Sequence, residues 1–300
     1  MAQMTKPPDP NTKTPKLTCP PGAIDAHFHL FGPKERYSFA ADAAYESADA
    51  LPETLMHMHR VLGISGGVLV NAGAYGRNPQ HLLDTLTRFP DYFRGIVVPP
   101  DHLSDDEIGR MDALGVRGVR FFSHPRGRNL APILPELAAA VHERGWHVQF
   151  YGHPGGIAER ADAQLALPNR IVLDHFGTVI AERGLNQPAF QTILRMLDTG
   201  RVWVKMSGPM RCSKLDPPYP DMIPFAHALV RHAPERLVWG SDWPHPNMND
   251  QVMPNDGDLL DLMLDWVPDT ATRNRILADN PRALYGFGPV EQSGQPTRMA

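Results

Sequence analysis

Short runs of β-branched and other apolar residues alternate along the chain with longer stretches whose apolar residues recur every three or four positions. Such runs are typical of buried strands, and the longer stretches of amphipathic helices. We expect eight strands, at Ala23–His29, Gly67–Asn71, Phe93–Val98, Val116–Phe121, His147–Tyr151, Arg170–His175, Val202–Ser207 and Arg236–Asp242. Helices are expected at Glu53–Leu62, Pro79–Arg88, Ser104–Leu114, Ile133–Arg144, Pro188–Thr199 and Pro224–His232, between Asp258 and Leu284 and, with a weaker helical period, at Ile157–Leu165.

This steady alternation of strand and helix predicts a parallel sheet with right-handed crossovers. Eight units suit a closed, TIM-like (β/α)₈ barrel. An open doubly wound sheet would suit about five or six strands better, and no GxGxxG follows the first strand. We expect one catalytic domain over residues 21–288, a disordered N-terminal arm rich in Pro, Lys and Thr over residues 1–20, and a loose C-terminal tail over residues 289–300.

Composition narrows the classes of function. The net charge is −4 and the Lys and Arg residues are scattered, so we expect no nucleic-acid partner. No apolar run approaches the roughly 20 residues of a membrane helix, and no apolar segment of a signal peptide follows the N-terminus. Two cysteines, Cys19 and Cys212, form no disulfide framework. The sequence therefore predicts a soluble, cytoplasmic enzyme that acts on a small molecule. It does not decide whether the protein is a monomer or a homo-oligomer.

In a barrel of this kind the chemistry sits at the C-terminal ends of the strands. His27 and His29 end the first expected strand, and residues two apart on a strand point to the same side. They are therefore expected to meet at one ligand, unless they are simply packed core histidines. His57 and His59 have the same spacing, but they lie in a helical pattern that turns them apart. We interpret this second pair as solvated surface.

Two further strand ends carry candidate catalytic groups. Asp242 ends the last expected strand, where it could serve as a metal ligand, a general base or both, or only cap a helix. His175 ends the sixth strand, whereas its neighbour Asp174 is expected to point away and to orient a neighbour or bridge to a helix. The predicted catalytic set is Asp242, His27, His29 and His175. In our hypothesis Asp242 takes a proton from water, and the three imidazoles polarise the carbonyl that the water attacks.

A group of cations near strand ends predicts a substrate with carboxylates, because arginine binds carboxylates through two parallel hydrogen bonds. The alternative is that each has a solvated head at the surface. The expected substrate-binding residues are Arg120, Arg126, Arg211, Lys205, Tyr45, Tyr151 and Asn71. His153 follows the fifth strand and is interpreted either as a further ligand or as a loop histidine.

Three motifs together resemble the amidohydrolase superfamily. They are the His27–His29 pair followed by Leu30-Phe31-Gly32-Pro33, the Asp-His-x-Gly that ends at Gly177, and Trp-Gly-Ser-Asp-Trp-Pro-His-Pro-Asn ending at Asn247. Within the superfamily the chain looks like the branch of 2-pyrone-4,6-dicarboxylate lactonase, from about Pro21 to Tyr285. The resemblance implies a distorted barrel that hydrolyses a pyrone dicarboxylate lactone in aromatic catabolism, without a bound metal. It implies carboxylate binding by Arg120, Arg126 and Arg211, with Tyr45 and Tyr151.

Some positions depart from that pattern. Asp-His-Phe-Gly-Thr-Val begins at Asp174 where an Arg-Pro is expected after the glycine, and Ser207-Gly208 stands in place of a Thr-Cys pair. Related branches act on sugar-acid lactones or sulfomuconolactone, and some carry one zinc. A rival interpretation is a metal-dependent decarboxylase with one divalent ion held by His27, His29, His153 and Asp242. A third is a barrel that binds a lactone without turning it over.

Overall fold

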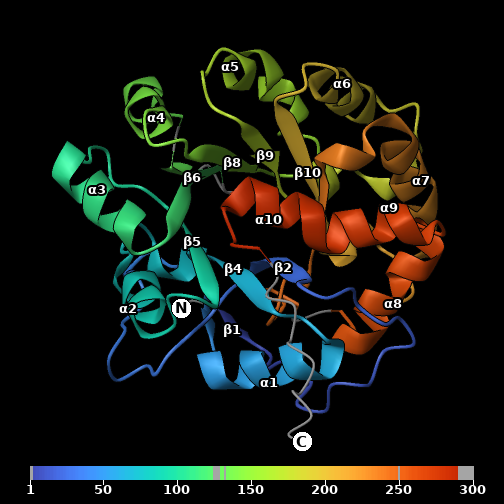
Figure 1. Cartoon of the computed structure of the whole chain (residues 1–300), viewed down its shortest axis with the longest axis horizontal. Coiled ribbons are helices and arrows are strands. Elements are labelled where there is room, and N and C mark those ends of the chain that lie inside the picture. The colour runs from blue at the N-terminus through green and yellow to red at the C-terminus, as the bar shows by residue number, and fades with distance from the viewer. Residues whose placement is uncertain (1–2, 124–128, 132, 249–250, 290–300) are drawn as a thin grey trace, which may run out of the picture.

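The computed structural model describes residues 3–123, 129–131, 133–248 and 251–289. Eight parallel strands lie side by side in the order β11-β10-β9-β8-β6-β5-β4-β2 and curve into a nearly closed barrel (Figure 1). They are β2 Ile24–Phe28, β4 Gly66–Val70, β5 Phe93–Val97, β6 Val116–Ser123, β8 His147–Tyr151, β9 Ile171–Leu173, β10 Val202–Ser207 and β11 Leu237–Gly240. The predicted (β/α)₈ barrel is confirmed, because each expected strand forms within a few residues of its expected bounds.

Helices surround the strands, and α10 crosses the end of the barrel that faces the viewer in Figure 1. The α-helices are α1 Pro52–Leu62, α2 Gln80–Arg88, α3 Asp105–Ala113, α4 Pro135–His142, α5 Ala161–Leu165, α6 Pro188–Leu197, α7 Ile223–His232, α8 Asp256–Trp266, α9 Thr270–Asn274 and α10 Asn280–Tyr285. The short 3-10 helices are η1 Gly73–Tyr75, η2 Ala158–Arg160, η3 His175–Thr178, η4 Ala181–Arg183, η5 Pro209–Arg211, η6 Pro220–Met222 and η7 Pro234–Arg236, and Arg275–Asp279 (η8) is a π-helix. Tyr285 of α10 is fully buried against His147 at the start of β8, so α10 covers the end opposite the expected active site.

The helices bury one face each, as α1 illustrates. Its buried side chains include Leu55, Met58, His59 and Leu62, which recur at helical spacing. The interpretation of His57 and His59 as a solvated pair is therefore wrong for His59, which is fully buried, although His57 is exposed as expected. The helix does turn the two imidazoles apart, but His59 lies on the apolar stripe with Leu55, Met58 and Leu62.

The N-terminal arm, predicted from composition to be disordered, contacts the barrel in its described part. Gln3–Thr5 forms strand β1, which pairs in parallel with β3 (Tyr45–Ser47). Leu17 is buried, and the backbone amide of Lys13 donates to the side chain of Asn255. Composition could not show these contacts, because they pair the arm with residues far along the chain. A second short strand, β7 (Asn129–Ala131), runs antiparallel to β6.

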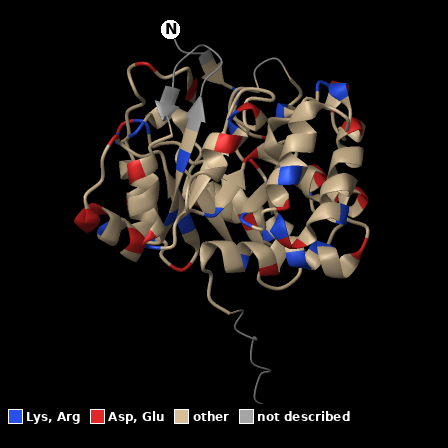
Figure 2. Cartoon of the chain, turned by 90° about the horizontal axis from the view of Figure 1, so that it is seen from above, with Lys and Arg blue, Asp and Glu red and all other residues tan. Residues whose placement is uncertain are grey.

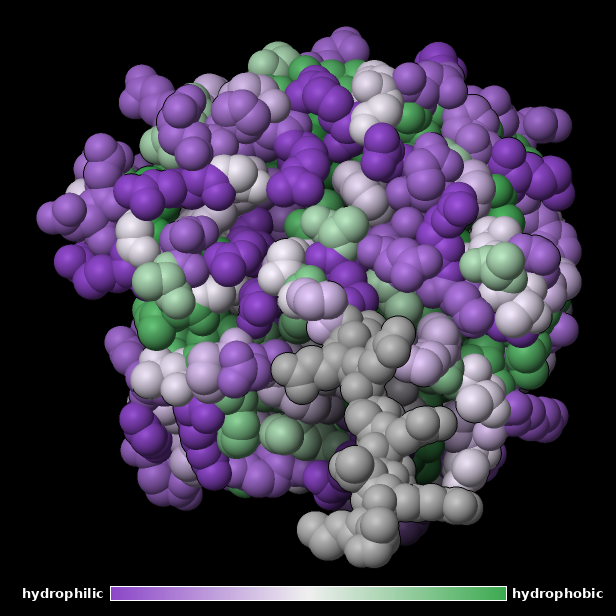
Figure 3. Space-filling view, viewed as in Figure 1, coloured by the Kyte–Doolittle hydropathy of each residue, from purple (hydrophilic) through white to green (hydrophobic). Residues whose placement is uncertain are grey.

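Charged and apolar residues are both spread over the molecule in Figures 2 and 3. Lys and Arg positions are interspersed with Asp and Glu positions along the helices in Figure 2. The face shown in Figure 3 is mostly hydrophilic, with hydrophobic residues in small separate areas. Within the described ranges, no helix combines the length and apolar character that crossing a membrane requires.

Candidate active site

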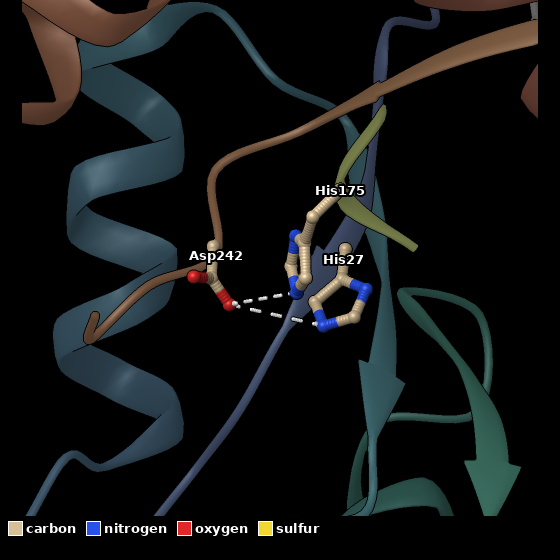
Figure 4. Close-up of side chains that lie close together, drawn as sticks. All are labelled: His27, His175 and Asp242. Atoms are coloured by element: carbon tan, nitrogen blue, oxygen red, sulfur yellow. Dashed lines mark ion pairs between the residues drawn. The ribbon is translucent and has the colours of Figure 1, made fainter. Parts of the chain in front are cut away.

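The four residues of the predicted catalytic set come together at the C-terminal ends of β2, β9 and β11. The Nε2 atoms of His27, His29 and His175 each lie 3.8 Å from the same oxygen, Oδ1 of Asp242. Figure 4 shows the imidazoles of His27 and His175 pointing to this oxygen from separate segments. All four side chains are buried, with at most 5% of any of them exposed. Residues distant in the sequence therefore share one small volume.

Two backbone turns orient the side chains of Asp242 and His175, which follow β11 and β9. Asp242 has φ +64° and His175 has φ +47°, so both adopt the left-handed conformation that non-glycine residues rarely use. At His175 the turn interrupts strand alternation, so Asp174 and His175 both face the site. The expectation that Asp174 points away is therefore wrong, but its expected role of orienting a neighbour agrees with its contact to His27.

Each imidazole is held through its Nδ1 atom. Nδ1 of His29 lies 2.8 Å from the carbonyl oxygen of Val70, and Nδ1 of His27 lies 3.1 Å from Oδ1 of Asp174. Because the Val70 carbonyl can only accept, Nδ1 of His29 is assigned as a donor and its Nε2 as a lone pair. Nδ1 of His27 also lies 3.2 Å from the ammonium of Lys205, and its Nε2 lies 3.4 Å from Nε2 of His29, so each tautomer of His27 has a partner. Nδ1 of His175 lies 2.9 Å from the hydroxyl of Ser207, which can donate or accept.

Burial keeps these imidazoles neutral. It lowers the pKa of His29 to about 4, with the charge of Arg120 acting in the same direction. Burial also lowers the pKa of His27, together with Lys205, and that of His175. At neutral pH the site therefore offers unprotonated imidazole nitrogens around the Asp242 carboxylate.

Asp242 is held from its other side by Arg211. The guanidinium Nε donates to Oδ2 of Asp242 at 2.9 Å, and Nη2 lies 2.8 Å from the same oxygen. Burial would raise the pKa of Asp242, but Arg211 and the surrounding imidazoles outweigh it and hold the pKa below the usual range. Asp242 is therefore ionised, with Oδ1 turned to the imidazoles.

Asp174 is the centre of a second buried cluster of charged groups, on the Nδ1 side of His27. Its Oδ2 accepts from Nε of Arg120 at 3.0 Å and from the amide of Gln149 at 3.2 Å. Burial raises its pKa, but Arg120, His27 and Lys205 outweigh burial and hold the pKa well below its usual range. Gln149 was not among the residues predicted from the sequence. It could have been identified because His147, Gln149 and Tyr151 are spaced two apart along one expected strand and therefore lie on one face of it.

Lys205, expected to bind substrate, lies behind His27. Its Nζ is 3.2 Å from Nδ1 of His27 and donates to Oε1 of Gln149 at 2.8 Å. Since Nε2 of His27 faces Asp242, the ammonium is on the far side of the imidazole from the carboxylate. Burial lowers the pKa of Lys205 to about 8, partly offset by Asp174. Lys205 contacts groups that hold the site, and its side chain is fully buried.

Four further residues were expected to bind the substrate. The ring of Tyr151 packs edge-on against His175 and lies 5.0 Å from the guanidinium carbon of Arg120. Tyr45 is buried in β3, its ring packs edge-on against Phe31, and burial raises its pKa, an effect that the charges of Arg120 and Arg211 oppose. Asn71 donates to the carbonyl oxygen of Gly76. Arg126 lies outside the described residues.

The donor set suits one divalent metal ion, but not the set proposed from sequence. One ligand atom each from His27, His175 and Asp242 lie within 4.8 Å of one another. Nitrogen and carboxylate oxygen ligands are the ones that zinc takes in catalytic sites. His153 is not among them: its side chain is 38% exposed and lies 3.6 Å from the carboxylate of Glu159. Of the set proposed from sequence, His27 and Asp242 belong to this group, His29 and His153 do not, and His175 is added.

Comparison with known proteins places this arrangement in a family. The family model described as Amidohydrolase matches residues 24–287, which spans the whole barrel. A 4-sulfomuconolactone hydrolase of Rhizobium radiobacter is 36% identical over 89% of this chain and 91% of its own length. A 2-pyrone-4,6-dicarboxylate hydrolase of Comamonas testosteroni is 34% identical over 92% of this chain and 93% of its own.

A solved structure of similar sequence agrees. The crystal structure of a candidate 2-pyrone-4,6-dicarboxylic acid hydrolase from Pseudomonas putida superimposes with a TM-score of 0.77 at 32% identity, covering 89% of this chain and 98% of that one. The likeness therefore extends over the barrel and is not confined to the motifs.

Proposed function

This chain belongs to the amidohydrolase family, and on that premise we propose that it is a hydrolase that opens a small anionic lactone. The observation that carries the proposal is the convergence of three imidazole Nε2 atoms on Oδ1 of Asp242, each at 3.8 Å. A carboxylate and lone pairs that face one another repel unless something between them donates hydrogen bonds or carries positive charge. A water molecule meets that requirement, and it is the second reactant of lactone hydrolysis.

The chain's own residues supply the steps. Asp242 accepts a proton from the water through Oδ1, while the lone pair on Nε2 of His29 accepts the second hydrogen of the water and orients it. The water oxygen bonds to the ring carbonyl carbon, and the C–O bond of the ring then breaks. Asp242 returns the proton to the departing ring oxygen, so that the product is the open-chain acid.

His175 has a different part from His29. Because Ser207 can donate to its Nδ1, its Nε2 can carry the proton and donate to the oxygen of the attacked carbonyl. His29, which donates through Nδ1, cannot do this while neutral. We therefore assign polarisation of the carbonyl to His175 and not to His29.

The substrate class follows from charge. Arg120 and Arg211 lie at the site, where they contact Asp174 and Asp242 respectively. Arginine binds planar oxyanions through parallel hydrogen bonds, so two arginines in one buried region favour an anionic ligand. The relatives' names describe lactones with sulfonate or carboxylate groups. We propose a substrate of the same kind, bound by Arg120 and Arg211 with Tyr45 and Tyr151 beside them.

A metal ion is compatible with the same residues. His27, His175 and Asp242 would hold it, because their ligand atoms lie within 4.8 Å of one another. A bound divalent ion would supply Lewis-acid polarisation of the carbonyl or of water. Arg211, on Oδ2 of Asp242, already provides one positive charge there.

The test is a screen of purified protein against pyrone, muconate and aldonate lactones, followed by absorbance or proton release. We expect ring opening of an anionic lactone, and a loss of about 10²–10⁴ in kcat in Asp242→Asn with the fold retained. Asp198→Asn is the matched control, because Asp198 is an exposed carboxylate at the end of α6. Full activity in Asp242→Asn would refute Asp242 as the base, and an inert protein would refute the lactonase proposal.

A further inference from the structure

The first and last strands of the barrel meet at a seam that a side chain closes. β2 and β11 are the two ends of the strand order, and two backbone bonds join the segments at their C-terminal ends. The amide of Asp242 donates to the carbonyl of His27 at 2.8 Å, and the amide of His29 donates to that of Trp243 at 2.7 Å. Just below, Oδ1 of Asp25 accepts from the amide of His27 and from the amide of Ser241, each at 3.0 Å. One carboxylate thus bridges both strands.

The second oxygen of Asp25 strengthens the bridge. Oδ2 accepts from the hydroxyl of Ser241 at 2.5 Å and lies 3.2 Å from Nε2 of His59. The Ser241 hydroxyl in turn accepts from the amide of Trp243 at 3.0 Å. Asp25, Ser241 and His59 are almost completely buried, so water does not compete for these bonds.

The bridge holds the two residues on either side of Asp242. Ser241 is bound to Asp25 through its amide and its hydroxyl, and the hydroxyl of Ser241 holds the amide of Trp243. Asp242 between them has φ +64°, a conformation that a non-glycine residue keeps only where its surroundings enforce it. Close approach of the strands adds to this: a Cβ on Gly240 would lie 2.7 Å from the amide nitrogen of His27.

We propose that Asp25, acting through Ser241, is a positioning residue that holds Asp242 against His27 and His29. The expected loss of activity on substitution rests on the proposed lactonase function, whereas the expected change in the position of Asp242 does not. Asp25 contacts the backbone of His27 and not its imidazole, so it is placed to act through the strand ends. His59 supports Asp25 from α1, and its Nδ1 lies 3.2 Å from the hydroxyl of Tyr92.

Two variants test the proposal. Ser241→Ala removes the hydroxyl that joins Asp25 to Trp243, and Asp25→Asn replaces one accepting oxygen by a donor. We expect each to lower kcat by about 10–100-fold with KM changed less than about threefold, because the base is displaced while the substrate arginines remain. The matched control is Asp112→Asn, whose carboxylate accepts from Trp146 and Arg117 near the start of β6. It should lower the melting temperature without changing kcat.

A crystal structure of Ser241→Ala makes the result independent of substrate. We expect φ of Asp242 to leave the left-handed region, or Oδ1 to move away from the imidazoles of His27 and His29. Unchanged Asp242 geometry in that structure would overturn the proposal, as would an unchanged kcat in both folded variants. If the unsubstituted protein opens no lactone, the proposed function fails, and the position of Asp242 in the variant still decides the role of Asp25.

Discussion

Arg211 places both of its contacting nitrogens on one oxygen of Asp242: Nε donates to Oδ2 at 2.9 Å and Nη2 lies 2.8 Å from it. The other oxygen, Oδ1, is left to the three imidazoles. A single guanidinium therefore determines which oxygen of Asp242 faces the imidazoles. The same group is proposed to bind the substrate, so a substitution of Arg211 should affect both roles.

Replacement of Arg211 by Lys keeps the positive charge and removes the contact that Nε and Nη2 together make with Asp242. We expect KM to rise about tenfold or more and kcat to fall as well, because one ammonium cannot orient both the substrate and Asp242. Arg211→Met should be worse in both. Steady-state kinetics measure this, with Arg195→Lys on the exposed face of α6 as the control. A KM that stays constant in Arg211→Lys would contradict substrate binding by this residue.

Replacement of Lys205 by Met distinguishes a substrate ligand from a group behind His27. Because its Nζ contacts Nδ1 of His27 and the amide oxygen of Gln149, we expect kcat to fall about tenfold or more with KM within about threefold. Lys214→Met, an exposed lysine paired with Glu182, is the control. The opposite pattern, a raised KM with normal kcat, would mean that Lys205 contacts the substrate after all.

Zinc titration tests the corrected ligand set. Affinity should fall at least tenfold in His175→Ala, which removes one of the three converging ligand atoms, and should stay constant in His153→Ala. Calorimetry with the added ion, or cobalt absorption spectra, would measure it. Near-ultraviolet circular dichroism checks that both variants are folded. Equal losses in the two variants would restore His153 to the ligand set.

Stability should depend on pH through the buried neutral histidines. Burial lowers the pKa of His29 to about 4 and, with Lys205, that of His147 to about 3, from 6.5 in the unfolded chain. Between these values the unfolded chain binds more protons, so the free energy of unfolding falls as pH falls from 6.5 towards 4, by about 1.4 kcal/mol per pH unit for each such proton. The lowered carboxyl pKa values of Asp174 and Asp242 act only below about 3.8.

Urea unfolding at several pH values between 7 and 4.5 measures this slope. His147→Gln should flatten it, because the variant has no proton to take up at this position, whereas His142→Gln on the exposed face of α4 should not. Constant or increasing stability on acidification across this range would contradict the burial of neutral imidazoles.

Much of the fold and part of the site could be predicted from residue patterns. Strands β8 and β10 form at their expected bounds, because an apolar run flanked by turn-forming residues is a local signal. The convergence of His27 with His29 follows from strand alternation, which is also local. That Asp174 and His175, which are neighbours in the sequence, both face the site could not be predicted, because it depends on the left-handed turn that begins at His175.

The sequence by itself determined the barrel and the residue types at its catalytic end, since strand and helix periods and the order of the elements are written in neighbouring residues. Only the tertiary structure decided which charge meets which: Arg211 on Asp242, Lys205 behind His27, and Asp25 across the seam to Ser241. These pairs join residues from 31 to 216 positions apart. No periodicity reaches across such separations, so their partners are fixed by strand register and barrel closure.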